Sequence, residues 1–234
     1  MKYRRILLKL SGESLMGEQE YGISPLMLSR YAKEIKEIKE QGCEIGIVIG
    51  GGNIFRGIQG AAQGTDRVQG DYMGMLATLI NSMALQGELE KQGVKTELLS
   101  GLAIEPICKE HSRARAKEAI AEGKVVIIGA GTGNPYFTTD TASALRAIEI
   151  EADVILKGTR VDGVYTADPE KDPLATKYSE LSFLEALSKQ LKIMDLTAFA
   201  LCQDNNLPIY VFDMNKEGNL KKVIMGEHIG TLVK

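Results

Sequence analysis

The sequence contains few of the residues that form disulfides or bind transition metals, with 3 cysteines and 2 histidines among 234 residues. Cys43, Cys108 and Cys202 are far apart and form no Cys-x-x-Cys pair. This spacing argues against a disulfide framework or a zinc site and suits a reducing compartment. His111 precedes a polar stretch and His228 lies near the C-terminus, so we expect both at the surface. We therefore predict no metal-ligating residues.

Long apolar runs are also absent. The basic start at residues 1–5 is followed by only three apolar residues, Ile6–Leu8, before Lys9. A signal peptide needs an apolar run of about 7–15 residues, and a membrane span needs about 20. The net charge of −3 argues against a nucleic-acid partner, which would favour a basic surface. We therefore expect a cytoplasmic protein that binds neither membrane nor nucleic acid.

Strand-like and helix-like runs alternate along the whole chain, with no repeat and no linker between them. The middle strands are continuously apolar, which is typical of strands covered on both faces of a parallel sheet. We therefore expect one α/β domain over residues 1–234, a three-layer α/β/α sandwich with a mostly parallel central sheet. The expected strands are 5–10, 44–49, 96–99, 124–128, 153–156 and 208–212.

Helix boundaries are marked by capping residues. Ser24 and Pro25 are typical of the start of a helix, and Gly42 of its end. Leu28, Tyr31, Ile35 and Ile38 recur between them at spacings of three and four, which predicts one buried face. Five further helices are expected over 71–92, 112–122, 139–151, 181–190 and 196–205.

Three of the expected strands run directly into glycine-containing segments, at residues 9–12, 50–57 and 129–140. Glycine lets an anion approach main-chain N–H groups, and such groups at the start of a helix attract phosphate. Any one loop could be merely a tight turn between a strand and a helix. Three loops at the carboxyl edge of one parallel sheet instead favour a phosphate-binding site.

Two familiar nucleotide-binding motifs are absent. The chain contains no G-x-x-x-x-G-K-[ST] string and no G-x-G-x-x-G string, so a P-loop is excluded and an NAD site is disfavoured. Without a P-loop lysine, an enzyme that transfers a phosphoryl group needs another cation to balance the charge that builds up during the transfer. Lys9 ends the first strand and is the better candidate, whereas Lys157, at the end of another strand, is a weaker one.

The loop over residues 158–169 supplies groups that suit a nucleoside. Tyr165 could support an adenine ring, and Asp168 could accept hydrogen bonds from ribose hydroxyls. By itself the loop could also be a β-hairpin with an Asp-Gly turn.

These motifs together resemble those of the bacterial uridylate (UMP) kinases, which have the amino-acid kinase fold. The resemblance extends over essentially the whole chain and includes Lys9-Leu10-Ser11-Gly12, the run Gly-Gly-Gly-Asn-Ile-Phe-Arg-Gly at 50–57, and the segments 70–78, 131–140 and 161–169. It implies transfer of the γ-phosphoryl group of ATP to UMP with Mg²⁺, which gives ADP and UDP for pyrimidine nucleotide synthesis. Two alternatives stay open, another amino-acid kinase acting on carbamate, aspartate or a glutamate derivative, and a non-catalytic nucleotide-binding protein.

The resemblance also implies roles for individual residues. Lys9, Arg56 and Asp140 would be catalytic, and Asp195 would be either a polar contributor or a helix cap. The implied ATP contacts are Lys9, Leu10, Ser11, Gly12, Gly52, Arg56, Thr159, Tyr165 and Asp168. The implied UMP contacts are Gly51, Asp71, Thr132, Gly133, Asn134, Pro135, Tyr136, Phe137, Thr138 and Thr139.

Regulation and assembly are likewise implied by the resemblance. Family members form homohexamers that GTP activates and UTP inhibits. The segment implied in the response to GTP is Gly17, Glu18, Gln19, Glu20, Tyr21 and Gly22, which from its composition alone is a flexible polar loop.

Overall fold

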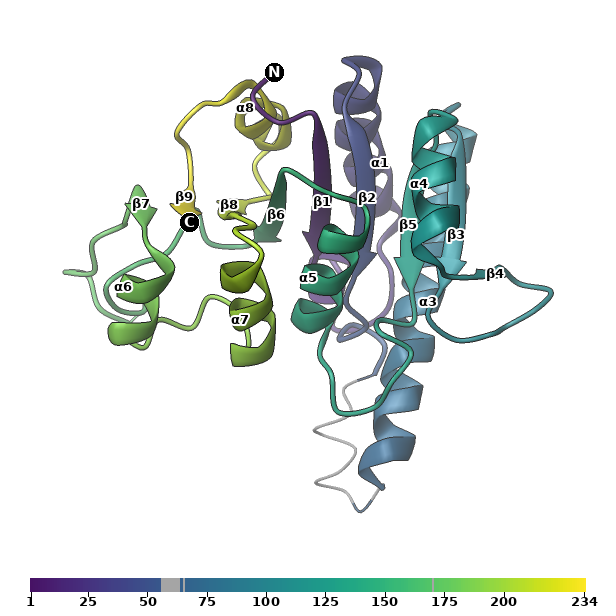
Figure 1. Cartoon of the computed structure of the whole chain (residues 1–234), viewed down its shortest axis with the longest axis horizontal. Helices are drawn as coiled ribbons and strands as arrows, with labels where there is room; N and C mark the ends of the chain where they lie inside the picture. The colour runs from purple at the N-terminus through teal and green to yellow at the C-terminus, as the bar shows by residue number, and fades with distance from the viewer. Residues whose placement is uncertain (56–63, 65, 170) are drawn as a thin grey trace.

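The computed structural model describes residues 1–55, 64, 66–169 and 171–234. These residues form a nine-stranded sheet in the order β4-β3-β5-β2-β1-β6-β8-β9-β7, with helices on both faces (Figure 1). The expected three-layer α/β/α sandwich is therefore confirmed. The strands are β1 (Arg5–Leu10), β2 (Glu44–Ile49), β3 (Thr96–Ser100), β4 (Lys109–Glu110), β5 (Val125–Gly129), β6 (Val154–Thr159), β7 (Glu180–Leu181), β8 (Ile209–Asp213) and β9 (Thr231–Val233).

The sheet is mostly parallel, and β1 lies near its middle, paired with β2 on one side and β6 on the other. Only the β8–β9 pair is antiparallel among the strand pairs of the described residues. Parallel neighbours β5, β2, β1 and β6 all end at the same edge. The loops that follow these four strands therefore meet at one edge of the sheet.

Two apolar layers hold helices to the two faces of the sheet. One layer packs α1 (Pro25–Glu40), α3 (Arg67–Lys91) and α8 (Asn219–Met225) on one face. The other packs α4 (Arg113–Ala121), α5 (Thr139–Glu149), α6 (Phe183–Ser188) and α7 (Leu196–Asp204) on the opposite face. A short 3-10 helix, η1 (Gly12–Leu15), follows β1.

The first helix begins where its capping residues predict. The Ser24 hydroxyl accepts a hydrogen bond from the Met27 N–H at 3.5 Å, and Pro25 takes the first helical position. Tyr31, Ile35 and Ile38 are fully buried, as the spacing of three and four predicts. The sequence thus places both the start and the buried face of α1 correctly.

Two expectations are wrong, and one alternative interpretation does not hold. Helix α3 begins at Arg67 rather than Asp71, because the Asp66 carboxylate accepts a hydrogen bond from the Gln69 N–H at 3.1 Å and caps the helix earlier. His228 is exposed as expected, but the His111 side chain is only 4% exposed. The loop after β6 is also no tight hairpin, because Tyr165 pairs with Lys177, twelve residues further along the chain.

Candidate active site

The first two glycine segments are in direct contact at the carboxyl edge of the sheet. The Gly50 N–H donates to the Leu10 carbonyl at 2.9 Å. A Cβ atom on Gly12 would lie 2.4 Å from the Gly50 carbonyl oxygen, and one on Gly51 would lie 2.9 Å from the Gly74 carbonyl oxygen of α3. Glycine is therefore needed here for close packing of the first loop against the second and of the second loop against α3, in addition to any role toward a ligand.

The third glycine segment joins β5 to α5. Ala130, Gly131 and Gly133 have φ values of 55°, 57° and 80°, so the chain turns sharply before the helix. Thr138 caps α5, because its hydroxyl accepts from the N–H groups of Asp140 at 3.0 Å and Thr141 at 3.3 Å. The loop therefore ends at a helix N-terminus, which favours an anion nearby.

Two lysines flank Asp140 beneath these loops. Lys9 of β1 and Lys157 of β6 are register partners in adjacent parallel strands, so their side chains lie on the same face of the sheet. The Lys9 ammonium lies 2.9 Å from Asp140 Oδ1, and the Lys157 ammonium lies 3.0 Å from Asp140 Oδ2. All three side chains are at most 17% exposed. Strand register and the first turn of α5 thus build this charged triad.

The charges of the triad act on one another. Burial alone would raise the pKa of Asp140, but the charges of Lys9 and Lys157 lower it below its ordinary value. Burial and the charge of Lys9 lower the pKa of Lys157, and Asp140 opposes this shift. With one carboxylate between two ammonium groups, the triad has a net charge of +1 and can attract phosphate.

Asp195 is both a helix cap and a member of a polar network. Its Oδ1 accepts from the Ala198 N–H at 2.9 Å and caps α7, as its sequence position suggests. Its Oδ2 accepts from the Thr141 hydroxyl at 2.9 Å and from the Thr138 hydroxyl. Asp195 therefore ties the start of α7 to the start of α5.

Three cavities follow one another along this edge. The first, of about 520 Å³, lies between α3 and the 131–139 segment, and we call it the acceptor cavity because most of the predicted acceptor contacts line it. The central cavity, of about 590 Å³, contains Lys9 and shares Glu13 with the acceptor cavity. The third, of about 500 Å³, shares Lys157 and Thr159 with the central one, and we call it the nucleoside cavity because the predicted nucleoside contacts Tyr165 and Asp168 line it. The shared lining residues place the three cavities next to one another in a row, which we call the cleft, and each is large enough for part of a nucleotide.

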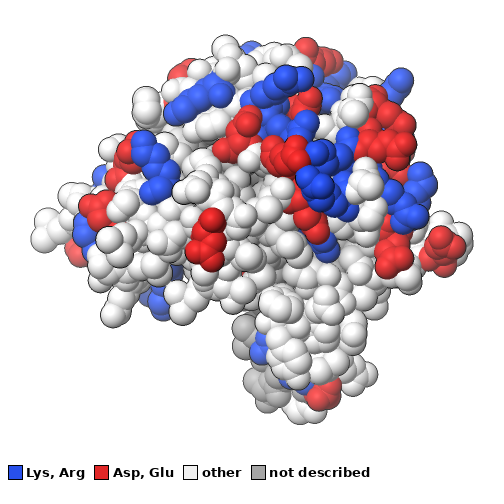
Figure 2. Space-filling model, viewed as in Figure 1, with Lys and Arg blue, Asp and Glu red and all other residues white. Residues whose placement is uncertain are grey.

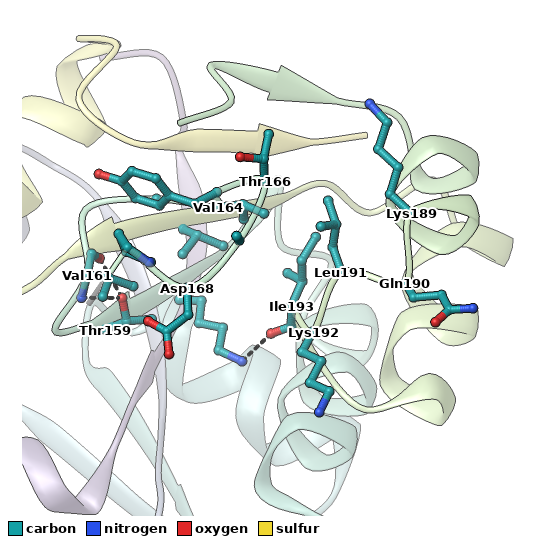
Figure 3. Close-up of a pocket in the computed structure, with 16 residues that line it drawn as sticks. Thr159, Val161, Val164, Thr166, Asp168, Lys189, Gln190, Leu191, Lys192 and Ile193 are labelled. Atoms are coloured by element: carbon teal, nitrogen blue, oxygen red, sulfur yellow. Dashed lines mark hydrogen bonds between the residues drawn. The ribbon is translucent and has the colours of Figure 1, made fainter. Parts of the chain in front are cut away.

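The nucleoside cavity has two facing walls. Thr159 and Asp168 lie on one wall, and Leu191 and Ile193 lie on the other (Figure 3). The Lys157 ammonium also donates to the Ile193 carbonyl, so the second wall is attached to the triad. A flat ring could enter between an apolar wall and a polar one.

The structure brings most of the predicted acceptor residues together. Those that line the acceptor cavity are Gly51, Asp71, Thr132, Asn134, Phe137, Thr138 and Thr139. Gly133 and Pro135 do not line it, and Gly133 packs against Gly101 instead. Tyr136 points outward with 67% exposure, although its N–H donates to Asp71 Oδ2 at 2.7 Å.

The predicted donor residues are divided among the cavities. Lys9, Ser11 and Thr159 line the central cavity, while Tyr165 and Asp168 line the nucleoside cavity. Gly52 lines the acceptor cavity. Gly12 and Leu10 are buried, so the Leu10 side chain belongs to the apolar core. Arg56 lies outside the described residues.

The predicted GTP-response segment borders the same cleft. Gly17 and Glu18 line the central cavity, and Gln19, Glu20 and Tyr21 are exposed. Gly22 is anchored to the second glycine segment, because it exchanges two hydrogen bonds of 2.8 Å with Asn53.

Several cavity residues escape sequence reasoning. Arg67 lines the acceptor cavity and forms an ion pair with Asp71 at 2.8 Å. Arg30 and Asn215 line the central cavity, and their side chains are 3.4 Å apart. Arg67 could have been found from its spacing of four residues from Asp71. Arg30 and Asn215 carry no local signal, because only the folded sheet brings them together.

Comparison with known proteins shows the family to which this chain belongs. The model of the amino acid kinase family matches residues 4–213. A uridylate kinase from Bacteroides thetaiotaomicron is 64% identical over 99% of this chain and 98% of that protein. The crystal structure of a UMP kinase from Bacillus anthracis has a TM-score of 0.97 at 37% identity, over 100% of this chain and 97% of that one. That of a UMP kinase from Ureaplasma parvum has a TM-score of 0.95 at 40% identity, over 100% of both chains. The chain therefore belongs to the amino acid kinase family and, within it, to the uridylate kinases.

Proposed function

We propose that the protein transfers the γ-phosphoryl group of ATP to UMP and forms ADP and UDP, a step of pyrimidine nucleotide synthesis. One observation carries the proposal, which is that Lys9 and Lys157, the two cations paired with Asp140, line the central cavity, with a further cavity on either side of it. Two nucleotides could thus meet at the triad. The relatives named uridylate kinase and UMP kinase support the choice of UMP as acceptor.

UMP would occupy the acceptor cavity. The Asp71 carboxylate would accept hydrogen bonds from the ribose hydroxyls. The uracil and phosphate would be bound by main-chain groups of the other lining residues, Gly51, Thr132, Asn134, Phe137, Thr138 and Thr139. Gly133, Pro135 and Tyr136 would act through the shape of this segment or through movement on binding, because they do not line the cavity.

ATP would occupy the other two cavities. Its nucleoside would lie in the nucleoside cavity with Thr159, Tyr165 and Asp168, and its phosphates would extend past Lys9 and Ser11. Gly12, Gly52 and the main chain of Leu10 would border the phosphates. Arg56 would add a guanidinium near the transferred group.

The chemistry would be direct in-line transfer with a UMP phosphate oxygen as nucleophile. No general base is needed, because the second pKa of a phosphate monoester is about 6 and the group is already ionised at neutral pH. Lys9 would stabilise the charge that develops on the transferred group. Asp140 would be a positioning residue that holds both ammonium groups in the cleft.

Mg²⁺ would enter with ATP. Both Asp140 oxygens already face ammonium groups, and no cluster of three potential metal ligands occurs among the described residues. This fits a metal bound mainly through nucleotide phosphates and water, as is usual for Mg²⁺. When bound, the ion would neutralise phosphate charge, and Lys9 and Arg56 would supply further positive charge from the protein.

Assembly as a homohexamer is part of the proposal, with other copies of this chain covering α3. Five large apolar side chains of α3 are between 40% and 50% exposed: Tyr72, Met73, Leu76, Ile80 and Met83. The protruding end of α3 is covered mainly by uncharged side chains (Figure 2). Such a patch favours contact with another protein surface.

Regulation and location complete the proposal. GTP would activate through residues 17–22, whose contact with Asn53 links them to the cleft. UTP would inhibit the enzyme. A cytoplasmic location, a single domain over 1–234 and the absence of a nucleic-acid partner are proposed from the sequence. In the described part of the chain, no helix is long and apolar enough to cross a membrane.

The proposal is tested by ADP release in a coupled assay with ATP, Mg²⁺ and UMP, CMP or dUMP, with and without GTP. We expect UMP to be the best acceptor. ADP release with carbamate, aspartate or glutamate but not UMP would favour another amino-acid kinase. Nucleotide binding without any ADP release would favour a non-catalytic protein.

A further inference from the structure

Arg146 is a buried cation that no part of the proposed mechanism uses. It lies in α5, six residues after Asp140, and is only 5% exposed. Its Nη2 donates to the carbonyl oxygen of Gly131 at 3.0 Å. A buried arginine that donates to a main-chain carbonyl fixes that carbonyl, because losing the contact would leave polar groups unpaired.

Gly131 belongs to the acceptor cavity, in a turn of unusual backbone conformation. Ala130 has a φ of 55°, which residues with a side chain rarely adopt, and Gly131 and Gly133 also have positive φ. Such a turn persists only when surrounding contacts determine it. Thr78 accepts from the Ala130 N–H at 2.8 Å on one side of the turn, and Arg146 donates to Gly131 on the other.

Glu149 holds the Arg146 guanidinium in place. The Arg146 Nη1 donates to Glu149 Oε2 at 2.9 Å and to Oε1 at 3.2 Å. The ring of His111 also approaches Glu149 Oε2, at 3.4 Å. Because burial and the charge of Arg146 lower the pKa of His111 to about 4, the ring is neutral at pH 7. Arg146 and Glu149 therefore form the charged pair that anchors the turn.

We propose that Arg146 is a positioning residue for the acceptor nucleotide. By fixing the Gly131 carbonyl, it sets the shape of the turn at residues 130–133, and with it one wall of the acceptor cavity. Because Asp140 and Arg146 lie on the same helix, α5 places the acceptor wall and the lysine triad in a fixed relation. The inference rests on the proposed function for the identity of the acceptor.

The test compares Arg146→Lys and Arg146→Gln with the unmutated protein. Arg4→Gln is the matched control, because Arg4 is an 82% exposed arginine that pairs with Glu44 away from the cleft. Three quantities are measured: the dissociation constant of UMP, the KM for ATP, and amide hydrogen exchange of residues 129–139 in the ligand-free protein. Losing one charge-assisted hydrogen bond should weaken UMP binding by roughly tenfold or more.

In the Arg146 variants we expect weaker UMP binding and a KM for ATP within about twofold of that of the unmutated protein. Amide exchange should become faster at residues 129–139, and by more than in the rest of the chain. Arg4→Gln should match the unmutated protein. The inference is overturned if UMP and ATP weaken equally, if exchange rises evenly over the whole chain, or if neither Arg146 variant folds. If the unmutated protein makes no UDP, the proposed function fails, while the exchange experiment still tests whether Arg146 holds the turn.

Discussion

Asp140→Asn removes a negative charge from between two largely buried ammonium groups. Both ammonium groups lie within about 3 Å of the Asp140 carboxylate, at 2.9 Å for Lys9 and 3.0 Å for Lys157. Breaking a buried ion pair by removing one partner costs about 3–5 kcal/mol. Because the side chains retain 13–17% exposure, we expect a cost at the lower end of this range, a decrease of about 3 kcal/mol in the free energy of unfolding.

Asparagine also leaves two like charges facing each other. We expect the pKa of Lys157, already lowered by burial and by Lys9, to fall further. Phosphate can then take over part of the role of the lost carboxylate. ATP should therefore raise the melting temperature of Asp140→Asn by more than it raises that of the unmutated protein, while kcat falls by about 10²-fold.

Urea unfolding, thermal melts with and without ATP, and steady-state kinetics measure these effects. Asp204→Asn is the control, because Asp204 is exposed at the end of α7. Unchanged unfolding and unchanged kcat in Asp140→Asn would refute the reasoning, since they would show that Asp140 does not hold the lysines.

The remaining predictions concern packing and pH. Gly12→Ala would place a Cβ atom 2.4 Å from the Gly50 carbonyl oxygen, so we expect a loss of about 1–3 kcal/mol in urea unfolding. Gly87→Ala, in open space on α3, should cost nothing; equal losses in both would contradict the packing argument. His111 has a folded pKa of about 4, so between pH 6.5 and 4 only the unfolded chain protonates it. The free energy of unfolding should fall by about 3 kcal/mol on acidification through this window. An equally steep fall in His111→Gln would show that His111 is not responsible for it.

The sequence predicts the central sheet well because its signals are local. The predicted strands 5–10 and 44–49 have the same bounds as β1 and β2, and Ser24 and Pro25 mark the start of α1. The last strand and helix, β9 and α8, were not predicted. They are short, and β9 exists only through its pairing with β8 and β7.

The site is partly predictable for the same reason. Lys9 carries a local signal, as a cation at the end of an apolar strand, and the glycine segments mark the edge. The triad as a whole carries no local signal in the sequence, because only the pairing of β1 with β6 places Lys157 opposite Lys9. The burial of His111 could not be predicted from its sequence neighbours, which are polar and suggest a surface position. In the fold, Glu149 of α5 covers its side chain.

The central claim is that Lys9 acts mainly in the transition state, where it stabilises the charge on the transferred phosphoryl group, and contributes little to the binding of UMP. The most direct test is steady-state kinetics of Lys9→Ala with both substrates varied, together with a urea curve to show that the variant is folded. We predict that kcat falls by about 10²- to 10³-fold while the KM for UMP changes by less than about threefold. Comparable losses in kcat and in UMP affinity, or a kcat near that of the unmutated protein, would contradict the account.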